Sequence, residues 1–410
     1  MEEIKKLSGE AREHLLGRII PFWRGLRDDV NGGWYGYMSY GLETDKDAVK
    51  GCILNSRITW FFANAYLWCK NGLITAGECE KHGYTPEDIL AEARHGYEFL
   101  KEHCLDRTNG GIYWSLHADG TPEDTTKHTY NQAFCIYALS SYYEATADAE
   151  ALKTAFELFE LIEEKCTDEV GYLEAFTVDF KPESNEKLSE NGVMAAKTMN
   201  TLLHVFEAYT QLYKVSKDER VGARLGWIMD TFADKIYNPE RHRQEVFFDE
   251  NYHSIIDLHS YGHDIETAWL IDHGVDVLGK ESYRSKLSPI TKDLTAQIYK
   301  IAFDGHSLAN ECDKGVVNEH RIWWVQAESV IGFLNGYQRD RSHAEYLEAA
   351  LRQWEFIKEY VIDKREGSEW FWEVDKNGKP YPDRPIVEPW KCPYHNGRMC
   401  MEIMRRAEEL

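Results

Sequence analysis

The stretch Asn55-Ser-Arg-Ile-Thr-Trp-Phe-Phe-Ala-Asn-Ala-Tyr66 is the first of six helical segments rich in aromatic and small residues. We anchor this segment at Arg57 and the others at Tyr130, Asn200, His263, Trp324 and His395. Consecutive anchors lie 73, 70, 63, 61 and 71 residues apart. Spacing of this kind is typical of a fold built from repeated supersecondary units.

A second type of helix alternates with the first and carries charges on one face. Its first copy covers about residues 2–25, with Leu15, Ile19 and Phe22 on the apolar face. Similar helices are expected near 85–103, 148–165, 216–235, 280–302 and 343–362. Twelve helices of two alternating types predict an all-α (α/α)6 barrel, a toroid of six helical hairpins. We expect residues 1–410 to form one such domain.

Short turn-rich stretches lie between the hairpins, and they predict small β-hairpins at one rim of the barrel. They are Asn31-Gly-Gly-Trp-Tyr-Gly36, Asn109-Gly-Gly-Ile-Tyr-Trp114, Gly171-Tyr-Leu-Glu174 and Glu369-Trp-Phe-Trp372. The inner helices of a double ring run parallel, so their first turns meet at one mouth. Polar residues early in each inner helix are therefore expected to line a common pocket.

The composition excludes several classes of function. The net charge of -23 repels nucleic acids and anionic membrane surfaces, and no 18-residue apolar stretch predicts a membrane span. The nine cysteines form no CxxC or zinc-binding spacing, which favours reduced thiols and a cytoplasmic protein. The 13 Trp, 24 Tyr and 17 Phe residues fit both core packing and stacking on sugar rings.

His263 and Glu266 form the richest candidate pair, because residues at positions i and i+3 share a helix face. A carboxylate beside an imidazole raises the histidine pKa and fixes its tautomer, which suits a general acid or base. Two alternatives stay open: a purely structural His–Glu pair, and metal ligation of the kind found in di-metal helix bundles. No second motif of this kind accompanies the first, so we predict no metal.

Other early residues of the inner helices add to this set. His395 follows Pro393 in a first helical turn, where the helix N-terminus lowers a histidine pKa. Asn200 and His204 share one face of their helix, and Arg57 needs a buried partner or an anionic intermediate. Trp324 and Glu328 supply an aromatic platform and a carboxylate. Together these residues predict acid–base chemistry without a cofactor on a polar substrate that stacks on aromatic rings.

These segments resemble the N-acylglucosamine 2-epimerase family over nearly the whole chain. The most specific matching stretches begin with Asn55-Ser-Arg and include Lys127-His-Thr-Tyr-Asn-Gln-Ala-Phe134, Lys197-Thr-Met-Asn-Thr-Leu-Leu-His204, Tyr261-Gly-His-Asp-Ile-Glu266, Trp323-Trp-Val-Gln-Ala-Glu328 and Trp390-Lys-Cys-Pro-Tyr-His395-Asn-Gly-Arg398. The resemblance implies an (α/α)6 barrel that works without metal or redox cofactor. It also implies epimerisation at C2 of the reducing-end glucose of a β-1,4-linked disaccharide such as cellobiose or lactose.

The resemblance further implies roles for individual residues. His263 and His395 would be the catalytic pair, through a cis-enediol or enediolate, with His204 as a third histidine in the pocket. Arg57 would stabilise the charge of the intermediate. The remaining expected site residues are two carboxylates that tune the histidines, Glu266 and Glu328, two tryptophans that stack on sugar rings, Trp324 and Trp390, and three further contacts, Asn200, Tyr113 and Trp114.

Three other functions fit parts of the pattern. An epimerase or aldose–ketose isomerase for monosaccharides would need nearly the same residues, with different rim loops. A glycoside hydrolase on this fold would need a pair of carboxylates across the scissile bond, whereas the catalytic-looking positions here are histidines. A non-catalytic sugar-binding protein would use the tryptophans but would not need three histidines at one mouth. We expect a monomer whose only partner is a small disaccharide.

Overall fold

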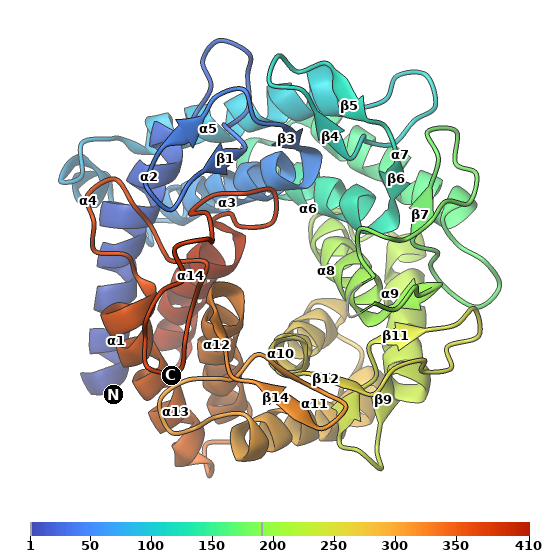
Figure 1. Ribbon diagram of the computed structural model, residues 1–410, viewed down its shortest axis with the longest axis vertical. Helices are drawn as coiled ribbons and strands as arrows, with labels where there is room; N and C mark the ends of the chain where they lie inside the picture. Colours follow the sequence, from blue (N-terminus) through green and yellow to red (C-terminus); the bar gives the residue numbers. More distant parts are fainter. Residues whose placement is uncertain (1, 190–191) are drawn as a thin grey trace.

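The computed structural model describes residues 2–189 and 192–410, which form two concentric rings of helices (Figure 1). The inner ring contains α3 (Cys52–Lys70), α6 (Thr129–Thr146), α8 (Met199–Ser216), α10 (Tyr261–Leu278), α12 (Trp323–Arg339) and α14 (Tyr394–Glu409). The predicted (α/α)6 barrel is therefore confirmed.

The outer ring consists of helices that run antiparallel to the inner ones, several of them extended by a π-helical turn (η). They are α1 (Glu2–His14) with η1 (Leu15–Ile19) and α2 (Ile20–Gly25), α5 (Pro86–Phe99) with η2 (Leu100–Cys104), α7 (Ala149–Lys165), α9 (Glu219–Thr231) with η3 (Phe232–Ile236), α11 (Glu281–Ile301), and α13 (Ala344–Phe356) with η4 (Ile357–Val361). A short extra helix, α4 (Ala76–Glu80), lies between α3 and α5.

The residue pattern explains which helices lie inside. The outer helix α7 buries Ala151, Ala155, Leu158 and Ile162, one apolar stripe at helical spacing. The inner helix α6 buries nearly all of its first fourteen residues, so it is covered on every side. No helix in the described ranges is long and apolar enough to cross a membrane.

Two-residue and three-residue antiparallel strands connect neighbouring hairpins at the mouth where the inner helices begin. The strand before an inner helix pairs with the strand that follows the next outer helix. These pairs are β3 (Lys50–Gly51) with β4 (Ser115–Leu116), β6 (Lys127–His128) with β7 (Ala175–Phe176), β8 (Lys197–Thr198) with β11 (Phe247–Phe248), β12 (Leu258–Ser260) with β13 (Glu311–Asp313), and β15 (Arg321–Ile322) with β16 (Glu373–Val374).

The ring is closed by an equivalent contact between the ends of the chain. Met38 N donates to Val387 O at 3.0 Å, and helices α1 and α14 pack against each other. The remaining strands also lie at this mouth. Here β1 (Tyr37–Met38) pairs with β2 (Thr44–Asp45), β5 (Pro122–Asp124) with β4, β14 (Val316–Asn318) with β13, and β9 (Tyr237–Asn238) with β10 (Arg243–Gln244).

The four predicted hairpins are present as tight turns, each closed by a single antiparallel bridge just after an outer helix. The bridges are Arg27–Trp34, Leu105–Ile112, Thr167–Tyr172 and Ile362–Trp370. Gly33 and Gly111 have φ values of +65° and +73°, and a Cβ on either would lie within 3 Å of a side chain from an inner helix. Glycine is therefore required at both turns.

Ion pairs made by buried cations fix the start of most inner helices. A cationic side chain two or three residues before the helix pairs with an acid at the turn after the preceding outer helix. A buried charge is costly unless it is paired, so these pairs hold the inner helices in register with the rim. They are Lys50–Asp28 (2.6 Å), Lys127–Asp106 (3.0 Å), Lys197–Asp168 (2.6 Å), Arg321–Asp304 (2.6 Å) and Lys391–Glu369 (2.9 Å).

Candidate active site

The expected site residues come together where the inner helices begin. Each lies in the first two turns of its helix, and all are largely buried. They are Arg57 on α3, His204 on α8, His263 and Glu266 on α10, Glu328 on α12 and His395 on α14, and they are joined by Tyr130 on α6, which was not expected. Residues almost 340 positions apart in the chain thus share one pocket, as the parallel inner ring predicts.

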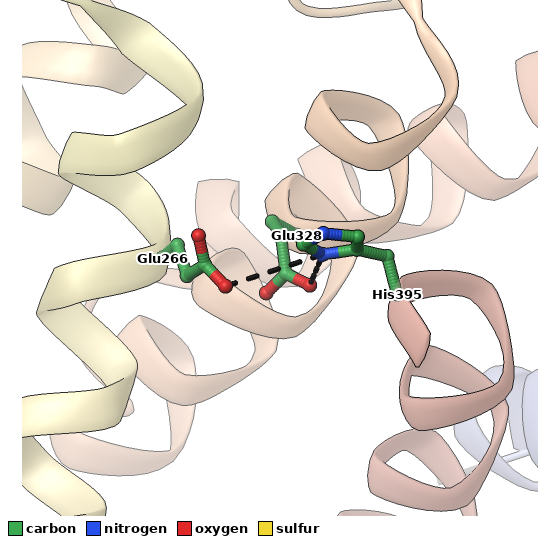
Figure 2. A group of neighbouring side chains, drawn as sticks. All are labelled: Glu266, Glu328 and His395. Atoms are coloured by element: carbon green, nitrogen blue, oxygen red, sulfur yellow. Dashed lines mark hydrogen bonds and ion pairs between the residues drawn. The ribbon is translucent and has the colours of Figure 1, made fainter. Parts of the chain in front are cut away.

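The centre of the site is a cluster of Glu266, Glu328 and His395 (Figure 2). The Nδ1 atom of His395 lies 2.7 Å from Glu328 Oε1 and 4.0 Å from Glu266 Oε1. Because a carboxylate accepts hydrogen bonds, Nδ1 carries the imidazole proton and Nε2 is left as the basic nitrogen. The arrangement is that of a neutral histidine base backed by an acid.

Arg398 holds this cluster together from the next turn of α14. Its Nη2 donates to Glu266 Oε1 at 2.5 Å and to Glu328 Oε1 at 2.7 Å, and its Nη1 donates to Glu207. Burial and the nearby Glu328 carboxylate raise the pKa of Glu266 well above its ordinary value. Burial also raises the pKa of Glu328, and the nearby Arg398 guanidinium opposes this rise.

The same three side chains were tested as a metal site. One atom from each of Glu266, Glu328 and His395 lies within 4.8 Å of the others. However, the guanidinium of Arg398 already donates to both carboxylates and occupies the position of a cation. The donor set therefore fits an internal ion pair, and we assign no metal to it.

His204 has its own carboxylate partner. Its Nδ1 lies 3.0 Å from Glu207 Oε2, which also accepts from the hydroxyl of Tyr394. Although burial alone would raise it, Arg398 and His204 hold the pKa of Glu207 at about 2. Burial lowers the pKa of His204. His204 thus resembles His395 in having Nδ1 held by a carboxyl group, which leaves Nε2 free for a substrate.

The predicted pairing of His263 with Glu266 is wrong. His263 Nδ1 bonds to Ser260 Oγ at 2.7 Å, and within the described residues no hydrogen bond or ion pair joins it to Glu266, which binds Arg398. The pKa of His263 is lowered to about 3, first by burial and then by the nearby His204, so it is not raised as expected. His263 and Glu266 do share a helix face, but the Glu266 carboxylate binds Arg398 and not His263.

Arg57 points into the aromatic part of the site. Its Nη2 donates to the hydroxyl of Tyr130 at 2.6 Å and its Nη1 to the backbone oxygen of Trp390 at 3.3 Å. The guanidinium carbon lies 4.1 Å from the ring centre of Phe134. No carboxylate in the described chain forms an ion pair with Arg57, so its positive charge is available to an anionic intermediate.

Aromatic rings line the two sides of the pocket. Trp324 lies 4.8 Å from His263 and 5.6 Å from His395, between centroids, so it stands between the two histidines. Trp390 and Trp114 meet edge to face at 5.7 Å on the other side. Both groups are only partly buried, which leaves ring faces open to a substrate.

The two remaining predicted contacts have different outcomes. Asn200 is half-buried on α8, and its Oδ1 has no partner among the described residues, so it can accept from a substrate hydroxyl. Tyr113 packs at the rim: its ring lies 4.3 Å from Lys127 Nζ, and burial and Asp106 raise the pKa of its hydroxyl. Its place in the substrate site stays a prediction.

Sequence reasoning missed Glu207, Arg398, Tyr130 and Tyr394 as site residues. Glu207 follows His204 by three positions, the same spacing that drew attention to His263 and Glu266. That signal was therefore present. The role of Arg398 could not be read from spacing, because its three acid partners lie on three other helices.

Comparison with known proteins agrees with this geometry. Residues 32–397 match the family described as N-acylglucosamine 2-epimerase (GlcNAc 2-epimerase). A curated cellobiose 2-epimerase from Eubacterium cellulosolvens is 50% identical over 414 residues, covering 97% of this chain and 98% of that protein. The chain belongs to the N-acylglucosamine 2-epimerase family. The predicted class of carbohydrate epimerase is thereby confirmed.

Two solved structures of epimerases show the same architecture. A sugar epimerase from a ruminal bacterium has a TM-score of 0.92 and 49% identity, covering 97% of this chain and 98% of that one. The cellobiose 2-epimerase of Bacillus thermoamylovorans has a TM-score of 0.90 and 41% identity, covering 98% and 100%. The family fold thus extends over essentially the whole chain.

Proposed function

We propose that the chain epimerises C2 of the reducing-end glucose of β-1,4-linked disaccharides, with cellobiose as a substrate. One observation carries the chemistry. Three buried histidines at one mouth, His204, His263 and His395, each have Nδ1 bound to a protein partner and Nε2 left for a substrate. The cellobiose 2-epimerases at 41–50% identity over nearly the full chain support the substrate.

The reaction begins when the hemiacetal ring opens, because the aldehyde at C1 acidifies the proton on C2. His395 removes this proton from one face of C2, and the resulting imidazolium is stabilised by Glu328 at 2.7 Å. With the Ser260 hydroxyl donating to Nδ1, the neutral His263 ring carries its proton on Nε2. His263 gives this proton to the other face of C2 and so inverts the centre, and the proton taken up by His395 returns to His263 through sugar hydroxyls or solvent before the next turnover. In the return direction the two histidines exchange roles. General acid–base catalysis of this kind contributes about 10²–10⁴-fold.

Arg57 is suited to the cis-enediolate that forms between these two steps. Its guanidinium is buried and has only neutral hydrogen-bond partners, Tyr130 and the backbone of Trp390. A fixed cation in a site shielded from water stabilises a developing oxyanion without reorganising at the moment of reaction. His204, held by Glu207, can exchange a proton with a nearby sugar oxygen.

The aromatic walls provide for the second sugar. Trp324 lies beside both catalytic histidines. Trp390 and Trp114 pack against each other. Stacking of pyranose faces on these rings would hold the non-reducing glucose toward the rim.

Product analysis tests this proposal. Purified protein incubated with cellobiose should form 4-O-β-glucosyl-mannose, and neither His395→Ala nor His263→Ala should retain substantial activity. The exposed His343→Ala should behave as wild type. Release of free glucose would instead indicate a hydrolase. Substantial epimerisation by either active-site variant would contradict the assigned roles.

An epimerase or isomerase for monosaccharides is the alternative function. It requires the same histidines, and only the rim decides whether a second sugar is bound. The paired comparison is therefore cellobiose against N-acetylmannosamine and mannose, with kcat/KM measured for each. A higher value for either monosaccharide would favour this alternative.

We further propose that the protein acts in the cytoplasm, as one catalytic domain and as a monomer. All nine cysteines are free, which suits a reducing compartment. The packing of α1 against α14 closes the ring within a single chain, and every site residue comes from that chain. Size-exclusion chromatography with light scattering would test the monomer.

A further inference from the structure

A second cavity lies in the barrel beneath the active site, toward the C-terminal ends of the inner helices. Its volume is about 160 Å³. Five of its lining residues each follow a site residue on the same inner helix by seven positions: Asn64, Tyr137, Gln211, His273 and Glu402. Seven residues are about two helical turns, or about 10 Å. The cavity is therefore a separate level of the barrel.

We propose that this lower cavity binds one neutral monosaccharide and that its occupant influences the catalytic histidines. The binding claim is independent of the proposed function, whereas the influence on catalysis depends on it. Three features of the cavity support this proposal: its walls, its hydrogen-bonding groups with no partner, and the side chains that it shares with the active site.

The walls combine aromatic rings with charges that are already neutralised. Trp60 and Tyr137 stack at 5.2 Å with an interplanar angle of 20°, and Trp68 and Trp269 add two further indoles. The charged lining residues are paired within the protein, as in the Arg405–Glu402 pair at 2.7 Å. A neutral ligand with C–H faces suits these walls better than an ion does.

Several polar atoms in the cavity are not used by the protein. Asn64 and Gln211 donate through their amide nitrogens, to Trp60 O and to Glu144, but no described residue donates to their amide oxygens. No hydrogen bond from the described chain reaches either ring nitrogen of His273. Burial lowers the pKa of His273 to about 4, so the neutral ring offers one donor and one acceptor. Such groups match sugar hydroxyls.

The cavity has room for one sugar ring. A water molecule needs about 10–15 Å³ of a cavity measured in this way, so about 160 Å³ accommodates roughly ten waters, close to the number of heavy atoms in a hexose. A single hexose offers both a C–H face and several hydroxyls, and D-glucose and D-mannose are suitable probes.

Three side chains form the wall between this cavity and the active site. Glu207 binds His204, Arg398 binds Glu266 and Glu328, and Trp269 Nε1 donates to Glu328 at 2.9 Å; all three also line the cavity. A ligand that contacts them alters the groups that hold His204 and His395. By linkage, a disaccharide in the active site then changes the affinity for the monosaccharide by the same factor.

The test uses ¹³C-labelled D-glucose and D-mannose with the whole protein, in the presence of saturating cellobiose that fills the active site. NMR should show labelled monosaccharide still bound to the wild type. His273→Phe, which fills the cavity, should lose this binding, and Asn64→Leu should weaken it as a second variant. His343→Phe, at an exposed position outside the lining, should retain it.

Kinetics supply the second readout. Monosaccharide should change kcat for cellobiose at least twofold in the wild type and leave kcat unchanged in His273→Phe, while competition at the active site, seen in KM, persists in both. Complete displacement of labelled glucose by cellobiose, or equal binding by wild type and His273→Phe, would overturn the binding claim. Epimerisation itself would then be unaffected, so the proposed function is tested separately.

Discussion

Replacing Glu328 by glutamine tests the acid that supports His395. The substitution keeps the shape of the side chain and an oxygen that can accept from His395 Nδ1. It removes the charge that faces the imidazolium formed when C2 loses its proton. A hydrogen bond to a charged group contributes about 1.5–3 kcal/mol. Its loss in the transition state alone corresponds to about a 10- to 160-fold lower kcat.

The structure also predicts a cost in stability for Glu328→Gln. Glu328 Oε2 accepts from the indole of Trp269 at 2.9 Å, and Oε1 accepts from Arg398 at 2.7 Å. A glutamine offers only one accepting oxygen, so one buried donor loses its partner, at about 1–3 kcal/mol. Arg398 keeps Glu207 and Glu266, and the fold should therefore persist.

Initial rates of cellobiose epimerisation and thermal unfolding, measured side by side, check both effects. The acid limb of the pH–kcat profile should also move to lower pH, because a neutral amide no longer favours the imidazolium. Glu163→Gln is the matched control: Glu163 accepts from Tyr172 and Tyr209 at 2.8 Å on the outer helix α7. It should lose stability without losing kcat. A folded Glu328→Gln variant with at least half of the wild-type kcat would refute the reasoning.

Three further predictions concern the rim and the buried histidines. Lys127→Met should lower the free energy of unfolding by about 3–5 kcal/mol in denaturant titrations, because it leaves Asp106 buried without its cation. Tyr113→Phe should change kcat/KM for cellobiose less than twofold, since its ring packs on Lys127. Because the pKa values of His263 and His395 are lowered by burial, both are neutral in the fold. The stability that they contribute is complete above pH ~6.5 and is lost as pH falls, with a loss on the order of 1 kcal/mol at pH 5.5 for His263.

Each of these predictions has an outcome that contradicts it. Loss of less than 1 kcal/mol in Lys127→Met, against an exposed control such as Lys153→Met, would show that the rim pairs do not hold the fold. A large kinetic effect of Tyr113→Phe would place that ring in the site after all. Unfolding free energies that stay constant between pH 7 and pH 5 would contradict burial of neutral histidines.

The ring architecture could be predicted from the sequence because its cause is local and repeated. An inner helix must be apolar or small on every side, and an outer helix only on one, so α6 and α7 differ visibly in their residues. The ion pairs at the rim escaped prediction for the opposite reason. Lys127 is easily seen in the sequence just before its helix. Its partner Asp106 lies 21 residues earlier, and only the folded chain brings the two side chains together.

The sequence could predict most of the residues that form the site, but not which of them bind one another. Helical spacing shows that Glu266 shares a face with His263 and that Glu207 shares one with His204. Only the second pair forms, because Arg398, 132 residues from Glu266, binds that carboxylate instead. Which partner Glu266 binds depends on contacts between helices, so the spacing of residues along one helix cannot predict it.

Proton exchange at C2 is the most direct test of the central claim. Cellobiose incubated with the protein in D₂O would be followed by NMR at C2 and at the anomeric positions. Two histidines that act on opposite faces through an enediolate predict 4-O-β-glucosyl-mannose that carries deuterium at C2. Epimerised product that retains its original hydrogen at C2, or cellobiose cleaved to glucose, would contradict the account.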